Sequence, residues 1–278
     1  MIHLFALLSL LLCGVCYTGF QNSSHFHNTS NRRSLLLLVF GGALLLRLLL
    51  AYTTHGFSND IACFAAWADR IFTLGPGQFY SAEMFTDYPP GFMYVLYLIG
   101  ALRSLLQIPY YSDLHILLLK LPAILCDIAC GFLLYREAVK RLHFSDLQGI
   151  FAASAYLFQP AVILNSSCWG QVDSVYTLMI ILMCLFLMKG NLLPAYAVYG
   201  LGVLLKPQML IFTPVLLAGI WDHVFLHDFS WRKFFYNLCG GLSVICGMFL
   251  LCAPFGLTAA ISQYTSTLGS YEYAAINA

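Results

Sequence analysis

Residues 34–54 read SLLLLVFGGALLLRLLLAYTT, a run in which Arg47 is the one charged side chain. The hydrocarbon core of a bilayer is about 30 Å thick, and a helix needs roughly 20 apolar residues to cross it. This run therefore predicts a membrane-spanning helix. Arg32 and Arg33 come directly before it, and the positive-inside rule places them in the cytoplasm. The chain then leaves this helix on the outer side of the membrane.

The composition of the whole chain agrees with a membrane protein. Of its 278 residues, 60% are hydrophobic and only 9% are charged, and the mean hydropathy is +0.80. These values are far from those of an ordinary soluble domain. The net charge is +1, and the Lys and Arg residues form no clustered basic surface of the kind that follows a phosphate backbone. The composition thus excludes nucleic acid as a partner.

The cysteine and histidine residues predict no metal site. Most of the ten cysteines lie inside apolar runs, where cysteine acts as a small packing residue. The sequence has no C-x-x-C motif with a matching partner pair, and its histidines lack the spacing of zinc ligands. We therefore expect neither a metal nor a bound cofactor.

Further apolar runs predict an all-α, polytopic bundle of transmembrane helices. They are residues 114–135, 147–166, 174–188, 192–206, 208–221 and 234–253. Basic residues follow the first of these runs (Arg136, Lys140, Arg141) and precede the last one (Arg232, Lys233). If the runs cross in alternating directions, every basic cluster between spans falls on the cytoplasmic side. We accordingly predict an integral, multi-pass protein of the cell membrane.

Two regions leave alternatives open. Residues 55–113 belong to the outer side, and their apolar stretch 92–106 is short and opens with Pro89-Pro90-Gly91. We expect that stretch to be interfacial or re-entrant, with a crossing helix as the alternative. Residues 192–221 are interrupted at Lys206-Pro207, so they form either two short spans or a pair of half-helices that meet at a cavity.

The first 33 residues are separate from this pattern. MIHLFALLSLLLCGVCYTGF, residues 1–20, reads as a signal-like apolar region or an additional span, and a polar linker without periodicity follows it. We divide the chain into an N-terminal hydrophobic segment and linker, 1–33, and a membrane domain, 34–278, with an outer loop at 55–113.

Four charged residues lie within the predicted spans, where a charge costs at least ~2.5 to 3.5 kcal/mol and so needs a partner or a function. Lys120 and Asp127 share one helix face, and their simplest role is pairing between helices. Arg47 either extends toward the headgroups or contacts a ligand there. Lys206 precedes the helix-breaking Pro207, so its flexible ammonium either extends to the interface or meets a lipid phosphate.

The outer loop carries the densest set of polar side chains. They are Asn59, Asp60, Asp69, Arg70, Glu83 and Asp87, with Trp67 and Tyr88 among them. Apolar residues recur at helical spacing over 60–73, which predicts a short amphipathic helix on the membrane surface. Asp60 at its start is either an N-cap or a general base that removes a proton from an acceptor hydroxyl.

A second outer cluster, residues 165–174, reads NSSCWGQVDS and joins two predicted spans. Its hydrogen-bonding side chains and the aromatic face of Trp169 suit sugar hydroxyls. The alternative is an interfacial tryptophan with a helix cap made by Asp173 or Ser174.

Five strings in order resemble one protein family: N-D-I-x-x-F-x-x-W-A (59–68), D-Y-P-P-G (87–91), K-L-P-A-x-x-x-D (120–127), N-S-x-x-W-G-Q-V-D-S (165–174) and L-L-K-P-Q (204–208). The chain resembles the GT-C fold glycosyltransferases that use polyprenyl-phosphate sugars, and most of all the bacterial mannosyltransferase-like proteins related to the GPI-anchor mannosyltransferase. The resemblance covers the chain from about residue 34 onward.

This resemblance implies a hexosyltransferase with its active site on the outer face. Asp60 would be the catalytic base, and the residues binding donor or substrate would be Arg47, Asp87, Tyr88, Trp169, Gln171, Asp173 and Lys206. The donor would be a polyprenyl-phosphate hexose, with mannose favoured, and the acceptor a hydroxyl of a glycan, lipid or protein. The reaction would invert the sugar carbon and need no metal. Family members usually carry further spans, so the resemblance also implies a chain that is incomplete at its C-terminus.

Two other function classes fit the same residues. A polytopic transporter or lipid flippase would also carry intramembrane charges and a broken helix at Lys206-Pro207. A non-catalytic membrane fragment would make those charges dispensable. An acidic amphipathic outer loop favours the enzyme over both.

Overall fold

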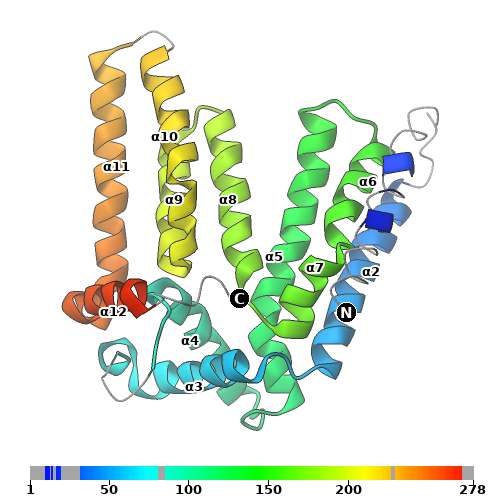
Figure 1. Ribbon diagram of the computed structural model, residues 1–278, viewed down its shortest axis with the longest axis vertical. Helices are drawn as coiled ribbons and strands as arrows, with labels where there is room; N and C mark the ends of the chain where they lie inside the picture. The colour runs from blue at the N-terminus through cyan, green and yellow to red at the C-terminus, as the bar shows by residue number, and fades with distance from the viewer. Residues whose placement is uncertain are drawn as a thin grey trace. The chain divides into compact units, whose positions relative to one another are not determined.

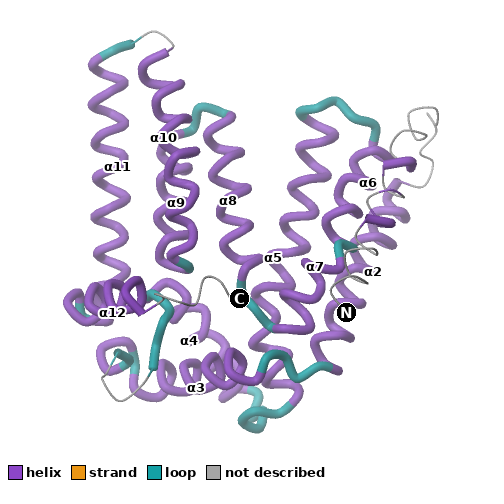
Figure 2. Tube along the Cα trace, viewed as in Figure 1, coloured by secondary structure: helices purple, strands orange, loops and turns teal. Residues whose placement is uncertain are grey.

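The apolar run that opens the membrane domain forms α2 (Arg32–Thr53), and the computed structural model continues from it as a series of helices (Figure 1). The structure describes residues 10–12, 14, 17–19, 32–80, 85–226 and 229–270. Throughout these residues the regular structure is helical, as Figure 2 shows. The predicted all-α, polytopic bundle is confirmed. Most of the predicted segment 1–33, as well as Glu83 and residues 271–278, lies outside the described residues.

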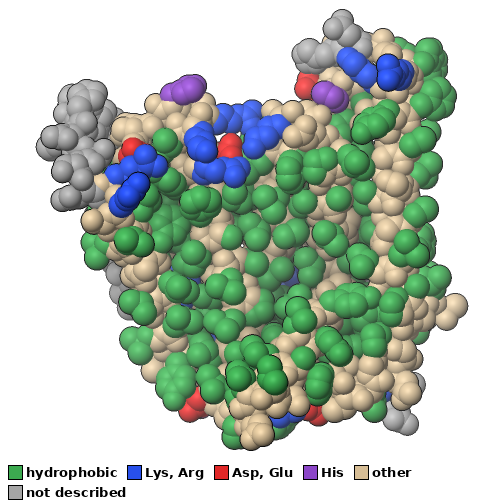
Figure 3. Space-filling view, turned by 180° about the vertical axis from the view of Figure 1, so that it is seen from behind, with side chains coloured by type: hydrophobic (Ala, Val, Ile, Leu, Met, Phe, Trp, Pro, Cys, Tyr) green, Lys and Arg blue, Asp and Glu red, His purple; other side chains and the backbone are tan. Residues whose placement is uncertain are grey.

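Four helices of the described chain are long and apolar enough to cross a membrane. They are α2, α5 (Asp113–Lys140), the stretch Pro207–Leu226 and the stretch Trp231–Phe255. The bent pair Asp146–Leu157 and Pro160–Trp169 raises the number to five if it counts as one span. In Figure 3 hydrophobic side chains cover the flanks of the helices, and Lys and Arg side chains gather near helix ends. The chain is a multi-pass membrane protein.

The helices group into two compact units. The first unit holds residues up to Ala62 together with Ile108–Leu178, and the second holds Cys63–Gln107 together with the residues from Met179 onward. The predicted outer loop 55–113 thus contributes to both.

The first unit is built on the antiparallel pair α2 and α5. His55, which follows α2, has its Nδ1 3.6 Å from Oδ1 of Asp113 at the start of α5. At the opposite end, Nε of Arg32 lies 3.2 Å from Oδ1 of Asp146. Segment 55–113 therefore begins and ends at the same end of this unit, as the predicted outer loop requires. A single crossing by the stretch 92–106 would instead separate its two ends.

The third helix of the first unit is broken where the sequence predicted one span, 147–166. Helix α6 (Asp146–Leu157) starts with a capping box made by Ser145 and Gln148. Pro160 then begins α7 (Pro160–Ile163), because proline lacks an N–H and is tolerated only in the first turn. The axis bends by 51° at this break. One turn of π-helix, η2 (Leu164–Trp169), completes the segment.

The second unit combines α3 (Ser58–Leu74) and α4 (Pro90–Leu105) with a second group of helices. Helix α3 begins in the first unit and continues here, and α4 follows the short turn η1 (Pro76–Gln78). The second group comprises α8 (Asp173–Met188), whose first turns belong to the first unit, α9 (Leu192–Leu205), η3 (Pro207–Phe212), α10 (Thr213–Trp221), η4 (Asp222–Leu226) and α11 (Trp231–Cys252). The turn η5 (Ala253–Phe255) and α12 (Leu257–Ser270) end the described chain.

Helix α3 is the amphipathic helix that the sequence predicted for residues 60–73. Its Phe64, Trp67, Ala68 and Ile71 are buried. They pack toward α4, and a Cβ added at Gly100 of α4 would lie 2.5 Å from the Ala68 carbonyl oxygen. Helix α4 has 16 residues, fewer than a full span needs, which agrees with an interfacial position.

The chain reverses at Lys206, where the sequence predicted a break. Lys206 has extended backbone angles (φ −152°, ψ 125°) because the residue before a proline avoids the helical region. Helix α9 ends there, and Pro207 opens η3, which continues into α10. The stretch Pro207–Leu226 is long enough to be a span of its own, whereas α9 has 14 residues.

Candidate functional site

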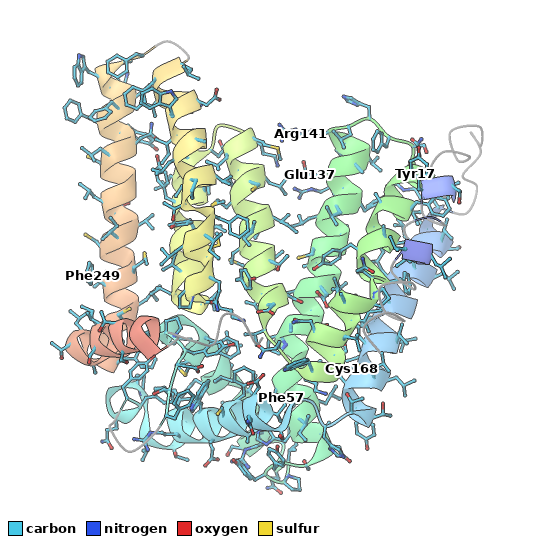
Figure 4. All side chains as sticks on the ribbon, in the orientation of Figure 1. Tyr17, Phe57, Glu137, Arg141, Cys168 and Phe249 are labelled. Atoms are coloured by element: carbon cyan, nitrogen blue, oxygen red, sulfur yellow. The ribbon has the colours of Figure 1, made fainter. Side chains whose placement is uncertain are left out.

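The corner between α2 and α3 is tied to the end of η2. The Phe57 N–H donates to the Trp169 carbonyl at 2.9 Å, and the two rings lie 5.2 Å apart between centroids. In Figure 4, Phe57 and Cys168 lie at one end of the first unit, whereas Glu137 and Arg141 lie at its other end. This corner and the basic residues after α5 are thus at opposite ends of the unit.

Asp60 is held in place by the segment after η2. Its Oδ2 accepts a hydrogen bond from Trp169 Nε1 at 3.0 Å and a second, short one from Gln171 Nε2. Its Oδ1 accepts none from any residue in the described ranges, and the side chain is half-buried. The structure therefore joins into one site two clusters that the sequence presented separately, 109 and 111 positions apart for the two pairs.

The interpretation of Asp60 as an N-cap is wrong. Helix α3 begins at Ser58, so Asp60 lies within the first turn, and its carboxylate bonds to side chains of another segment. A carboxylate in the first turn still interacts favourably with the helix dipole. The bonds to Trp169 and Gln171, however, set its orientation.

The segment that carries Trp169 and Gln171 has a defined shape of its own. The N–H groups of Gly170 and Gln171 both donate to the Asn165 carbonyl, at 3.1 and 3.0 Å. Gly170 has φ 90°, and a Cβ there would lie 2.6 Å from Cδ1 of Ile61. Only glycine fits this position.

Asp173 stabilises this segment through a hydrogen bond. Nδ2 of Asn165 donates to its Oδ2 at 2.9 Å, and α8 begins at Asp173. Helix α8 thus begins one residue before the predicted run 174–188, and the contact joins the two ends of the η2 segment.

Lys120 has a structural role at this corner. It is fully buried, and its Nζ donates to carbonyl oxygens of Thr54 (2.7 Å), Ala51 (3.2 Å) and Cys168 (3.5 Å). These three bonds connect α5 with the end of α2 and with η2. Pairing between helices is thus confirmed for Lys120, but its partners are backbone carbonyls. A sequence shows no signal for such partners, because every residue carries a carbonyl.

Arg47 requires a correction. Its side chain is 0% exposed, and its Nε lies 3.3 Å from Oδ2 of Asp127, which is also 0% exposed. The expectation that Arg47 extends to the headgroups is wrong, because α5 and α2 enclose the guanidinium. Arg47 would have to leave this ion pair to reach a ligand, so it is not among the residues that we propose to bind the donor.

Asp127 is saturated with donors. Besides Arg47, the hydroxyls of Ser166 (2.6 Å), Ser174 (2.6 Å) and Tyr156 (3.1 Å) donate to its carboxylate. A buried charge is tolerated where its hydrogen bonds are satisfied in this way. The network joins α2, α5, α6, η2 and the start of α8 within the first unit.

The second unit holds the predicted residues Asp87, Tyr88 and Lys206. The Lys206 Nζ lies 5.9 Å from the centre of the Tyr88 ring, a cation–π distance. The Tyr88 carbonyl accepts a bond from the Tyr80 hydroxyl at 3.0 Å, and burial raises the pKa of that phenol above its ordinary value. Asp87 is half-buried beside Tyr88.

Two further polar residues of α3, Asp69 and Arg70, stabilise the fold. Asp69 pairs with Arg103 of α4, and Arg70 donates to the carbonyls of Phe79 (2.9 Å) and Gln78 (3.0 Å). Within the described ranges, no three His, Cys, Asp or Glu side chains converge on one point that could hold a metal ion. The expectation of a reaction without metal stays a prediction.

Comparison with known proteins does not assign this chain to a family. No model of a known protein family matches the chain, and a search of curated protein sequences also finds no match.

Proposed function

We propose that this protein is a membrane glycosyltransferase that moves a hexose, with mannose favoured, from a polyprenyl-phosphate carrier to an acceptor hydroxyl. The observation that carries the proposal is the carboxylate of Asp60. One of its oxygens is fixed by the N–H groups of Trp169 and Gln171, and its other oxygen, which accepts no bond from the described residues, is open to a ligand. A general base needs this combination of fixed orientation and a free oxygen within reach of a proton.

The chemistry follows from that geometry. Oδ1 of Asp60 takes the proton of the acceptor hydroxyl while the acceptor oxygen forms a bond to the anomeric carbon. The bond from that carbon to the phosphate oxygen breaks, and the lipid phosphate leaves with the electron pair. Attack from the face opposite the phosphate inverts the carbon. The half-exposed indole of Trp169, 49% accessible, offers an aromatic face to the C–H side of a sugar ring.

Lys206 is the proposed contact for the donor phosphate. Its ammonium is a flexible point charge, which suits a phosphate oxygen. It extends from a helix break beside the aromatic side chain of Tyr88, and the half-buried Asp87 precedes that tyrosine. We propose that these three residues contact the donor.

The outer face of the membrane is the proposed location of the reaction. Basic residues lie at the end of the first unit opposite to Asp60, and basic residues favour the cytoplasm. Asp60 would then face outward, where lipid-linked sugars are used after they have been carried across.

The test is hexose transfer by the purified protein in liposomes, from a radiolabelled polyprenyl-phosphate hexose to membrane acceptors. Asp60→Asn keeps the shape and an acceptor oxygen but removes the base, so we expect a loss of about 10²- to 10⁴-fold. Asp113→Asn is the matched control, since Asp113 is an exposed carboxylate in the first turn of α5. Trp169→Phe should lower transfer less than Asp60→Asn does, because the ring stays and one donor is lost.

Three outcomes separate the function classes. Equal transfer by wild type and Asp60→Asn would remove Asp60 as the base. Absence of transfer with lipid or solute flux across the liposome membrane would favour a transporter or flippase. Absence of both, in protein that elutes as one folded species, would favour a non-catalytic membrane fragment.

A further inference from the structure

Two adjoining cavities lie among the helices α9, α10 and α11 of the second unit. One, of about 640 Å³, opens at the helix ends and has polar lining residues Asn191, His223, Ser230, Arg232 and Lys233. The other, of about 380 Å³, lies between α9, α10 and α11 and is lined by apolar side chains such as Leu216, Ile220, Phe234, Leu238 and Val244. Asn237 lines both cavities, so they adjoin at this residue.

We infer that the two cavities together bind an anionic membrane lipid. Its phosphate-bearing headgroup occupies the polar cavity, and one of its hydrocarbon chains occupies the apolar cavity. The inference does not depend on the proposed transferase activity, because it uses residues that have no part in that proposal.

The polar cavity has the chemistry of a phosphate site. Arg232 offers a planar fork of donors, Lys233 adds a second positive charge, and both side chains are exposed. Ser230 and Asn191 add neutral polar groups beside them. Asp222, the acidic residue described at this end, does not line the cavity. The cavity therefore favours an anion.

The apolar cavity has the chemistry of a hydrocarbon site. An apolar cavity of about 150 Å³ is enough to bind benzene, and this one is more than twice as large. It lies on α11, a 22-residue apolar helix with no buried residue, whose exposed side chains face the hydrocarbon of the bilayer. A lipid chain is the apolar partner that the membrane supplies at this place.

The depth of the site in the membrane fits a lipid headgroup. Tyr236 lines the polar cavity, and further exposed aromatic side chains lie in the stretch 221–231 that connects α10 to α11, namely Trp221, Phe225, Phe229 and Trp231. Such residues gather at the level of the headgroups. Figure 3 shows Lys, Arg and His side chains beside flanks covered with hydrophobic ones. Basic clusters face the cytoplasm, and the cytoplasmic leaflet is the one rich in anionic lipids.

The test compares two lipids that differ only in headgroup. The full chain in non-ionic detergent is titrated with phosphatidylglycerol or with phosphatidylcholine of the same chains, and bound lipid is counted by native mass spectrometry. We expect phosphatidylglycerol to bind more tightly. Each basic side chain near an anionic lipid contributes about fivefold, so Arg232→Gln with Lys233→Gln should weaken that binding about 25-fold. The double variant Lys140→Gln with Arg141→Gln makes the same charge change at exposed positions elsewhere and should leave binding unchanged.

A second pair of variants tests the chain cavity. Gly241 lines it, and no atom lies within 4 Å of a Cβ added there, so Gly241→Leu starts from an open position and adds its side chain to the cavity. Gly247 on the same helix has equally open space but does not line the cavity. We expect Gly241→Leu to weaken the binding of phosphatidylglycerol at least tenfold and Gly247→Leu to leave it unchanged.

Four results would overturn the inference. The first is equal binding of the two lipids, and the second is binding by Gly241→Leu as tight as that of the wild type. The third is displacement of the lipid by an equal concentration of glycerol phosphate. The fourth is a wild-type protein that forms a dimer in detergent, which Gly241→Leu converts to a monomer. The third result would mean a site for a free anion, and the fourth a contact between two copies of this chain.

Discussion

Asp60 and Asp127 are carboxylates with opposite surroundings. Asp127 is fully buried, and both of its oxygens accept hydrogen bonds from Arg47 and from three hydroxyl groups. Asp60 is half-buried, with one oxygen fixed and the other without a donor among the residues that the structure describes. A saturated carboxylate stabilises a fold, whereas an unsaturated and accessible one is able to take a proton. We therefore infer that Asp127 stabilises the fold and that Asp60 is the base of the proposed reaction.

The two members of the buried ion pair should differ in their effect on stability. Asp127→Leu leaves the Arg47 guanidinium and three hydroxyls without their acceptor, so we expect a loss of about 3 to 5 kcal/mol. Arg47→Met leaves a carboxylate that still accepts from the three hydroxyls, so its loss should be smaller. Thermal unfolding in detergent measures both. Equal losses of stability, or a larger loss for Arg47→Met, would contradict the expectation that Asp127 contributes more than Arg47.

Gly170 should matter for the position of Asp60. Gly170→Ala puts a Cβ on a residue with φ 90°, which strains the backbone of the segment with Trp169 and Gln171, and that Cβ would lie 2.6 Å from Ile61 Cδ1. We expect transfer to fall at least tenfold with a stability loss of about 1 to 3 kcal/mol. Gly247→Ala, at a helical glycine with open space, is the control. Unchanged transfer by Gly170→Ala would show that this segment does not hold the base.

At the scale of elements, short and irregular helices carry the candidate site. The end of α2, the first turn of α3 and the π-turn η2 meet at Lys120, whose ammonium binds carbonyls from two of these segments. π-Turns are frequent at functional sites because they redirect side chains that a regular helix would place elsewhere. Here the turn brings Trp169 to Asp60.

Helices α4 and α9 should not tolerate a larger residue at their contact. A Cβ at Gly91 would lie 2.5 Å from the Leu204 carbonyl oxygen, and a backbone atom cannot move aside as a side chain can. We expect Gly91→Ala to lower stability by about 1 to 3 kcal/mol. Gly77→Ala would place its Cβ 3.6 Å from the nearest neighbour, an ordinary contact, and should have little effect. Similar thermal unfolding of the two variants would mean that the helices separate easily.

At the scale of the molecule, the arrangement of the spans decides which ends face outward. The contact of His55 with Asp113 places both ends of the outer segment at one end of the first unit. The contact of Arg32 with Asp146 marks the other end. Two crossings, by α2 and α5, account for this arrangement without a crossing by α4.

Epitope tags inserted after His55, Tyr110 and His143 test this topology. We expect antibody to reach the first two tags on intact cells and the third only after the membrane is made permeable. If α4 crossed the membrane once, the tags after His55 and Tyr110 would appear on opposite sides. Thermal unfolding of each tagged protein serves as the control for folding.

Both the fold and some of the candidate residues could be predicted from the sequence. The predicted spans 34–54, 114–135 and 234–253 correspond to α2 (Arg32–Thr53), α5 (Asp113–Lys140) and α11 (Trp231–Cys252). The break at Lys206 and the amphipathic α3 were also predicted. Such features depend on local pattern, namely the length of an apolar run, its period and the position of a proline.

Only the tertiary structure decided which polar groups meet. The sequence by itself determined that Arg47, Lys120 and Asp127 lie at membrane depth and need partners. The packing of the helices paired Arg47 with Asp127, 80 positions away, and joined Asp60 to Trp169, 109 positions away. A local pattern fixes the polarity and the face of each helix, because both depend on neighbours in the chain. The partner of a buried charge depends on how the helices pack against each other, and that arrangement exists only in three dimensions.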